Sequence, residues 1–131
     1  MTIVAAPSAA IELCVGGNRA ARQVTCLVDG DTGWENGVKW RLVDIDAPEI
    51  SKAECAEEIV LGEWSVKRLM ELMSGGYTIE RSGAKDRTRD RRELVRVILP
   101  DGRDAGRVLL SEGLAQRWPN KGNRWCRVLA D

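Results

Sequence analysis

Apolar and polar residues alternate in several short runs over the first third of the chain, which is the pattern of β-strands. These runs are residues 11–15, 23–28, 32–34 and 38–45. Gly16-Gly17-Asn18 and Asn36-Gly37 stand between them and predict tight turns. Because a hairpin brings its outer ends together, we expect residues 29–31 and 46–49 to lie on the same side of the resulting meander.

A helical periodicity replaces this alternation over residues 53–73 and predicts the main helix. Its apolar stripe is expected to face the core and consists of Ile59, Gly62, Val66, Leu69, Met70 and Met73. Glycine at position 62 is expected to allow a close approach between the helix and the strands. Glutamates in the first turns suit the positive end of the helix dipole, and Gly75-Gly76 predicts the helix end.

The second half of the chain predicts two more strands and a short helix. The strands are expected at residues 77–81 and 93–99, on either side of a strongly basic loop at residues 85–92. Asp104 is the expected N-cap of a helix over residues 104–112. Residues 114–118 are expected to pack back on the body, with Trp125 anchoring a basic tail. Strands with an inserted helix indicate an α+β fold.

Length and composition indicate a single globular domain. The chain has 131 residues, of which 44% are hydrophobic and 31% charged, and no apolar run is long enough to span a membrane. Residues 1–10 are expected to form an N-terminal extension, and residues 11–131 the domain. The extension lacks a basic n-region and a long apolar h-region, so it is not an intact signal peptide, although it could be the remainder of one.

Charge is unevenly distributed along the chain, although the net charge is zero. Acidic residues outnumber basic ones over residues 1–80, and the reverse holds over residues 81–107. This separation fits a site in which one wall binds a cation and the other meets phosphates, but a charged solvent-exposed face would give the same pattern. Histidine is absent, which excludes Ser-His and Cys-His triads, histidine-ligated zinc and a histidine general base.

Two clusters of acidic residues at strand ends are the strongest candidates for chemistry. The first is Asp29-Gly30-Asp31-Thr32, and the second runs from Arg41 to Asp46-Ala47-Pro48-Glu49. Carboxylates and backbone carbonyls are the ligands of hard cations such as Ca²⁺, and a guanidinium matches phosphate oxygens two at a time. An isolated Asp-Gly-Asp is more often a solvated turn, but the two clusters in this order predict one site.

The double motif resembles that of the staphylococcal nuclease (thermonuclease) family, over about residues 26–118. The resemblance implies a five-stranded OB-fold β-barrel with about three helices. It also implies Ca²⁺-dependent cleavage of DNA and RNA that leaves 3′-phosphate ends, by a protein that acts as a monomer. The corresponding Ca²⁺ ligands are Asp31, Asp46 and the backbone carbonyl of Ala47, with Asp29 in support outside the ligand set.

The same resemblance assigns catalytic roles to three charged side chains. Glu49 matches the glutamate that handles the attacking water, and Arg41 matches the first catalytic arginine. Arg92 matches the second arginine, but the family's preceding Tyr-Gly is replaced here by Asp90-Arg91, which could alter the loop and lower activity. Arg87, Arg89 and Arg91 are the alternatives for this role.

Two more residues are expected to contact substrate. Lys85 would contact a phosphate, and Trp118 would stack on a base. A binding module with the same fold and no catalysis is the main alternative function, although such modules typically lose the acidic and arginine positions that this chain keeps. A zinc-stabilised domain is disfavoured because the cysteines form no C-x-x-C pair.

Four cysteines allow three disulfide pairings. Cys14 and Cys26 flank the first predicted hairpin with its turn near their midpoint, so they are expected to face each other across strands. This pairing leaves Cys55, at the start of the main helix, with Cys126 in the tail; four free thiols are the alternative. Two disulfides would indicate an oxidising compartment, such as a bacterial periplasm or the cell exterior.

Overall fold

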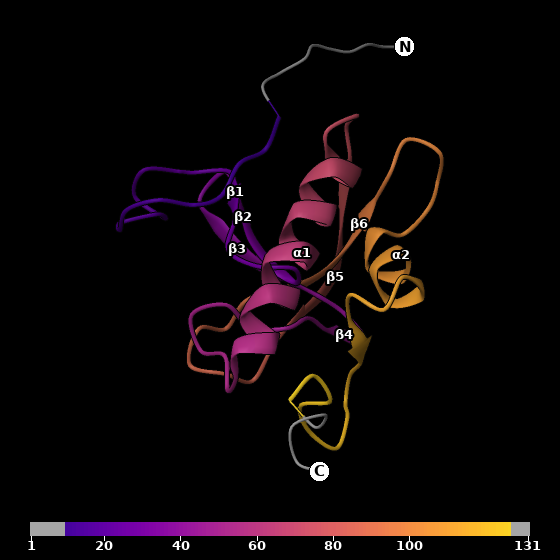
Figure 1. The fold of residues 1–131 in the computed structure, drawn as a ribbon. Helices are drawn as coiled ribbons and strands as arrows, with labels where there is room; N and C mark the ends of the chain where they lie inside the picture. The colour runs from indigo at the N-terminus through magenta and orange to yellow at the C-terminus, as the bar shows by residue number, and fades with distance from the viewer. Residues whose placement is uncertain (1–9, 127–131) are drawn as a thin grey trace.

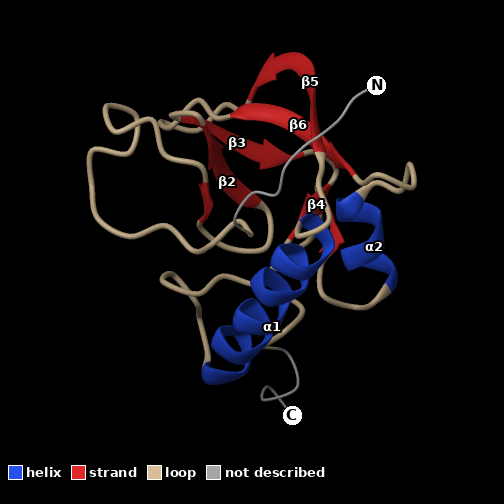
Figure 2. Ribbon diagram, turned by 90° about the horizontal axis from the view of Figure 1, so that it is seen from above, coloured by secondary structure: helices blue, strands red, loops and turns tan. Residues whose placement is uncertain are grey.

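A computed structural model describes residues 10–126 of the chain. Residues 1–9 of the predicted extension and residues 127–131 of the predicted tail lie outside this description. The described chain is an α+β domain in which both helices lie on the same side of the strands (Figures 1 and 2).

Five strands form the main sheet, in the order β1-β2-β3-β6-β5. Their bounds are Cys26–Leu27 (β1), Thr32–Glu35 (β2), Val38–Leu42 (β3), Thr78–Lys85 (β5) and Glu93–Ile98 (β6). Neighbours are antiparallel except for β3 and β6, which run parallel and place Arg41 opposite Leu94. A separate antiparallel pair joins β4 (Ile45–Asp46) to β7 (Gln116–Arg117).

Helix α1 (Ala56–Met73) supplies the crossover that a parallel β3–β6 pair requires, together with β5. Helix α2 (Ala105–Ser111) begins at Asp104, whose side chain accepts hydrogen bonds from the backbone N–H groups of Gly106 and Arg107, as predicted. The core lies between the helices and the sheet, and its most buried members include Leu27, Trp40, Leu42, Leu69, Val95, Val97 and Leu109.

The predicted closed barrel with about three helices is wrong. The main sheet is open, because β1 and β5 are its two edges and do not pair with each other in the described chain. The strand expected over residues 38–45 divides at Asp44, where a φ of 66° turns the chain out of the sheet. Only two helices occur among residues 10–126, because residues 118–126 form turns in which Asn120 and Asn123 bond nearby backbone N–H groups.

Several element boundaries also differ from the predictions. The strand expected over residues 11–15 is reduced to one bridge, between Leu13 and Leu27. Strand β5 runs on to Lys85, so the basic loop is shorter than predicted. On α1, Ile59 is 41% exposed rather than part of the core, whereas the polar Glu58 and Ser65 are buried.

Both predicted disulfides are present. Cys14 pairs with Cys26, with Cα atoms 4.9 Å apart, and Cys55 pairs with Cys126, with Cα atoms 5.9 Å apart. Two disulfides are compatible with an extracellular or periplasmic protein. Within the described residues, neither helix has the length and apolar character needed to cross a bilayer.

Candidate active site

One open cleft of about 620 Å³ brings together most of the residues that the sequence singled out. It is formed where the start of β2, strand β3, the chain after β4 and the β5–β6 loop meet. The predicted residues in its lining are Asp31, Arg41, Asp46, Glu49, Lys85, Arg92 and Trp118. Ala47 lines an adjoining pocket of about 260 Å³, which shares Asp46, Glu49 and Trp118 with the cleft.

Asp31 is buried, and both of its carboxylate oxygens accept hydrogen bonds. The hydroxyl of Thr32 donates to Oδ1 at 2.9 Å, and the backbone N–H of Ala47 donates to Oδ2 at 2.8 Å. Arg41 Nη1 lies 3.5 Å from the same Oδ2, while Arg41 Nη2 donates to the carbonyl of Ile45 at 3.1 Å. These contacts join the two acidic clusters of the sequence into one site.

Glycine at position 30 allows the turn at residues 29–31 to lie directly against α1. A Cβ atom at this position would stand 2.0 Å from Oγ of Ser65 and 2.9 Å from Cβ of Ala47. A side chain would therefore force apart the helix, the turn that carries Asp31 and the segment that carries Asp46.

Asp46 is oriented by two amide side chains from the chain beyond α2. Gln116 Nε2 and Asn120 Nδ2 donate to its Oδ2 at 3.1 and 2.9 Å. Neither amide was predicted as a site residue. Gln116 could have been identified from the sequence as a polar side chain within residues 114–118, a segment that was expected to pack against the rest of the domain.

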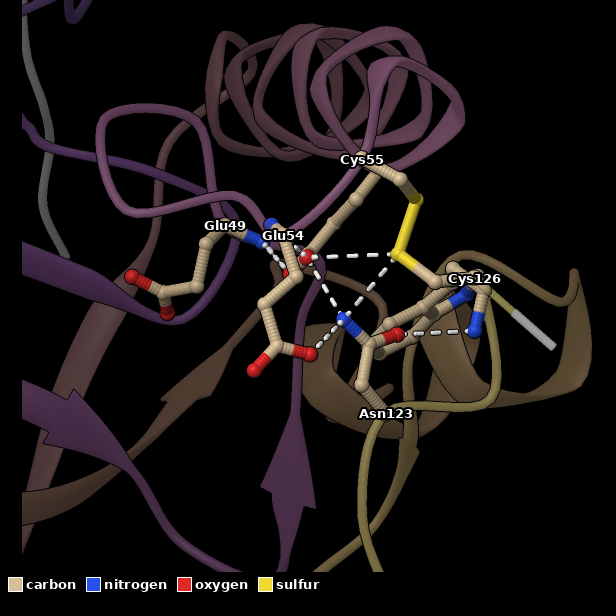
Figure 3. The surroundings of a disulfide bond; sticks show 7 residues. Glu49, Glu54, Cys55, Asn123 and Cys126 are labelled. Atoms are coloured by element: carbon tan, nitrogen blue, oxygen red, sulfur yellow. Dashed lines mark hydrogen bonds between the residues drawn. A yellow bond between two sulfur atoms is a disulfide. The ribbon is translucent and has the colours of Figure 1, made fainter. Parts of the chain in front are cut away.

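The backbone of Glu49 is held by Glu58, a buried residue of α1. Oε2 of Glu58 accepts the N–H of Glu49 at 2.7 Å, and Oε1 accepts the N–H of Glu54 at 2.9 Å. The amide of Asn123 donates to the same Oε1 at 2.6 Å. The carboxylate of Glu49 itself points away from this group of residues (Figure 3) and lines the cleft.

Glu58 was not predicted as a site residue, although the sequence contains a signal for it. Position 58 lies one turn before Gly62 on the apolar stripe, so a charged residue there had to be buried with partners. Glu54, Glu58 and Cys126 bring their potential ligand atoms within 4.8 Å of one another, close enough to hold a metal ion. The sulfur of Cys126 is tied in the disulfide, however, and the Glu58 oxygens are already satisfied by N–H groups, so this cluster is stable without a cation.

Arg92 connects the β5–β6 loop to the cleft. Its Nε donates to Asp86 Oδ2 at 2.6 Å, and its Nη1 donates to the hydroxyl of Thr32 at 3.1 Å. Arg91, at the position where the family resemblance led us to expect glycine, has a φ of 49°. The loop thus keeps a left-handed residue here, although a side chain is present.

Of the three alternatives to Arg92, Arg87 also lines the cleft, whereas Arg89 and Arg91 do not. Lys85 reaches the cleft from the end of β5. Trp118 is 51% exposed, and its ring centroid lies 5.5 Å from the guanidinium carbon of Arg41. The exposed indole is therefore placed beside the arginine that was expected to bind phosphate.

Burial and mutual repulsion between carboxylates together raise pKa values in and beside the cleft. Burial, and next the charge of Asp31, raise the pKa of Asp29 far above its ordinary value. Burial, and next the charges of Asp31 and Asp46, also raise the pKa of Glu49. A divalent cation would relieve this repulsion, and carboxylate oxygens are the donors that Ca²⁺ prefers. Asp31, Asp46 and Glu49 supply such oxygens, but no three of these carboxylates bring their ligand atoms within 4.8 Å of one another in the described chain.

Comparison with known proteins adds no relative. No protein-family model matches the chain, and no curated protein matches it in sequence.

Proposed function

We propose that this protein is a Ca²⁺-dependent phosphodiesterase that hydrolyses DNA and RNA to 3′-phosphate products. The observation that carries the proposal is the single cleft in which Asp31, Asp46 and Glu49 meet Arg41 and Arg92. Oxygen ligands for a hard cation, a carboxylate base and two guanidiniums are what such a hydrolysis requires in a chain without histidine. Its site would be that of a distant member of the staphylococcal nuclease family, on an open sheet.

In this proposal, the carboxylates of Asp31 and Asp46 and the carbonyl of Ala47 hold the cation. When bound, Ca²⁺ supplies positive charge opposite the phosphate oxygens and makes a nearby water more acidic. Glu49 accepts a proton from the attacking water, whose oxygen bonds to phosphorus as the P–O5′ bond breaks, and the leaving 5′ oxygen takes up a proton from solvent. Burial and the neighbouring carboxylates raise the pKa of Glu49, which brings it closer to neutral pH, as suits a general base.

Arg41 and Arg92 bind the phosphate and stabilise the negative charge that develops on its oxygens. Each guanidinium is oriented before substrate arrives, Arg41 by the Ile45 carbonyl and Arg92 by Asp86. Donors that are fixed in advance stabilise a charged transition state without reorganisation. The disulfides favour the periplasm or the cell exterior as the place of action.

Incubation of the protein with plasmid DNA, with Ca²⁺ or with a chelator, tests the proposal. We expect cleavage with Ca²⁺ and none with chelator. Glu49→Gln keeps the shape of the side chain but loses the base, so the rate should fall on the order of 10²-fold with little change in Ca²⁺ affinity. Glu57→Gln, an exposed residue in the first turn of α1, is the matched control and should cleave at the wild-type rate.

Two further variants separate the roles. Asp31→Asn removes charge from a ligand, so Ca²⁺ affinity should fall first and excess metal should restore part of the rate. Arg41→Lys keeps the charge but loses the two-pronged donor, so the rate should fall on the order of 10²-fold or more. Cleavage that persists in chelator, or at full rate in Glu49→Gln, would falsify the proposal. Retained DNA binding in that case would indicate a binding module.

A further inference from the structure

A second groove adjoins the cleft at Trp118. Its volume is about 320 Å³. The residues that line both the groove and the cleft are Val43, Asp44, Trp118 and Pro119. Three arginines from different elements also line the groove, namely Arg96 from β6, Arg107 from α2 and Arg117 from β7. The groove is thus a continuation of the cleft with a basic lining.

Two of these arginines form no ion pair in the described chain, because the two acids of the groove, Asp44 and Asp104, both pair with Arg96. Arg96 is bonded to Asp44 and to Asp104, each at 3.0 Å. Arg107 and Arg117 are exposed, and neither forms an ion pair within residues 10–126. Both guanidiniums are therefore available to a phosphate.

The pocket on the Ala47 side of the cleft has the opposite charge. Its charged lining residues are four carboxylates and one lysine, namely Asp46, Glu49, Glu54, Glu58 and Lys52. A strand of nucleic acid is repelled from that side and attracted to the arginines. Trp118 lines the cleft, the acidic pocket and the arginine groove alike, so a strand that leaves the cleft toward the arginines must pass its exposed ring.

Apart from Asp44 and Asp104, which are paired with Arg96, the remaining lining of the arginine groove is apolar. Val43, Ile45, Leu110 and Pro119 form it, beside the indole of Trp118. Apolar and aromatic surface of this kind takes the face of an unpaired base, which a duplex does not offer. Phosphate-binding and base-binding groups therefore occur together in one groove.

We propose that the arginine groove is a second nucleotide subsite, which binds the nucleotide next to the scissile phosphate of a single-stranded nucleic acid. The base lies on the apolar lining, and the phosphate is bound by Arg107 and Arg117. The subsite rests on the proposed nuclease function, and it narrows the preferred substrate to single strands longer than a dinucleotide.

Binding of a fluorescent oligothymidylate in chelator tests the subsite without requiring catalysis. Loss of two phosphate contacts in the double variant R107Q/R117Q should weaken binding roughly tenfold and reduce the slope of log K against log salt by about 1.4. The matched control is R19Q/K67Q, which removes the same charge from the N-terminal loop and from the exposed face of α1, and it should bind as the wild type does. Unchanged affinity and slope in R107Q/R117Q, or an equal loss in the control, overturn the subsite.

Two more measurements separate the subsite from the proposed function. With Ca²⁺, the KM advantage of an oligothymidylate over a thymidine dinucleotide should shrink in R107Q/R117Q, and an undiminished advantage overturns the subsite alone. If the wild type cleaves neither substrate, the proposed nuclease function is overturned. If R107Q/R117Q then still binds the oligonucleotide more weakly than the wild type does, the subsite is supported. A loss of binding to duplex DNA as large as that to single strands overturns the single-strand assignment.

Discussion

Arg91 holds a backbone conformation that its side chain disfavours, directly before a proposed catalytic arginine. Its neighbours impose this conformation. The backbone N–H of Arg92 donates to the side chain of Asp86, and its carbonyl accepts the N–H of Asp86. The loop is thereby closed across Arg91, so the strain is retained because the contacts of Arg92 outweigh it.

Replacement of Arg91 by glycine should relieve this strain. A left-handed backbone conformation costs a residue with a Cβ atom about 1–2 kcal/mol, which glycine would not incur. Glycine also has more conformational freedom in the unfolded chain, and this offsets part of the gain in stability. We therefore expect Arg91→Gly to raise the free energy of unfolding by up to about 1 kcal/mol, measured in urea. Arg89→Gly is the control, since Arg89 does not have a positive φ, and it should lower stability. A lower free energy of unfolding for Arg91→Gly than for the wild type would contradict the claim that the positive φ of Arg91 costs stability.

Asp86 should make the loop sensitive to acid. Burial by itself would raise its pKa, but hydrogen bonds from Thr88 and Arg92, with the Arg92 charge, lower it below the ordinary 3.8. A carboxylate with a lowered pKa contributes stability above its unfolded pKa, and this contribution is lost as the pH falls through the folded pKa. The wild type should therefore be more stable than Asp86→Asn at neutral pH, and the difference should narrow below about pH 3.8. A difference that is the same at both pH values would exclude this role.

Residues with distinctive chemistry could be predicted from the sequence, whereas residues that only donate hydrogen bonds could not. Asp31, Arg41 and Glu49 were predicted because their charges stand at fixed spacing around strand ends, and all three line one cleft. Gln116 and Asn120 were not, because an amide in a turn is common on any surface. Their role depends on a distant contact with Asp46 that no local pattern contains.

At the scale of elements, α1 sets the position of the segment that carries Glu49. The helix approaches this segment closely at Gly62, where a Cβ would stand 2.9 Å from the carbonyl oxygen of Glu49 and 3.0 Å from that of Pro48. The predicted role of this glycine was a close approach to the strands. The close contact is instead with the chain that leaves β4.

A Gly62→Ala substitution should therefore harm both stability and catalysis. Alanine favours a helix by about 1 kcal/mol over glycine, but overpacking against fixed backbone costs about 1–3 kcal/mol. We expect a net loss in urea unfolding and a lower rate of DNA cleavage, because Glu49 must move. Gly75→Ala meets no atom within 4 Å and should leave the rate unchanged. A Gly62→Ala protein with full activity would show that the segment yields without moving Glu49.

The same scale explains why the barrel was not a sound prediction. Alternation predicts which residues form strands, but sheet closure depends on strand length and on where a strand leaves the sheet. Strand β1 has only two residues, and Asp44 turns the chain away before β4. Neither property changes the alternating pattern, which predicted the α+β class, whereas the closed barrel was implied by the family resemblance alone.

At the scale of the whole molecule, the two disulfides should contribute unequally. Cys55 and Cys126 are 71 residues apart, whereas Cys14 and Cys26 are 12 apart. Loop entropy gives about 4 kcal/mol for the first bond and about 3 kcal/mol for the second. We expect the double variant C55S/C126S to lose more stability in urea than C14S/C26S.

The same pair of variants should also differ in activity. Only C55S/C126S frees the segment whose Asn123 binds Glu58 and whose Asn120 binds Asp46. Its rate of DNA cleavage should therefore fall further, under conditions in which both variants are folded. Equal rates in the two variants would indicate that the tail does not support the cleft.

Asn120 and Asn123 orient carboxylates that are synthesised long before them. These amides lie 74 and 65 positions after the carboxylates that they hold. A chain emerging from a ribosome carries its acids and arginines long before the groups that orient them. If the protein is exported, as proposed, the sulfur of Cys126 is oxidised later still. The proposed hydrolysis would thus begin only away from the messenger RNA that encodes the protein, because the last residues of the site are made when translation is nearly over.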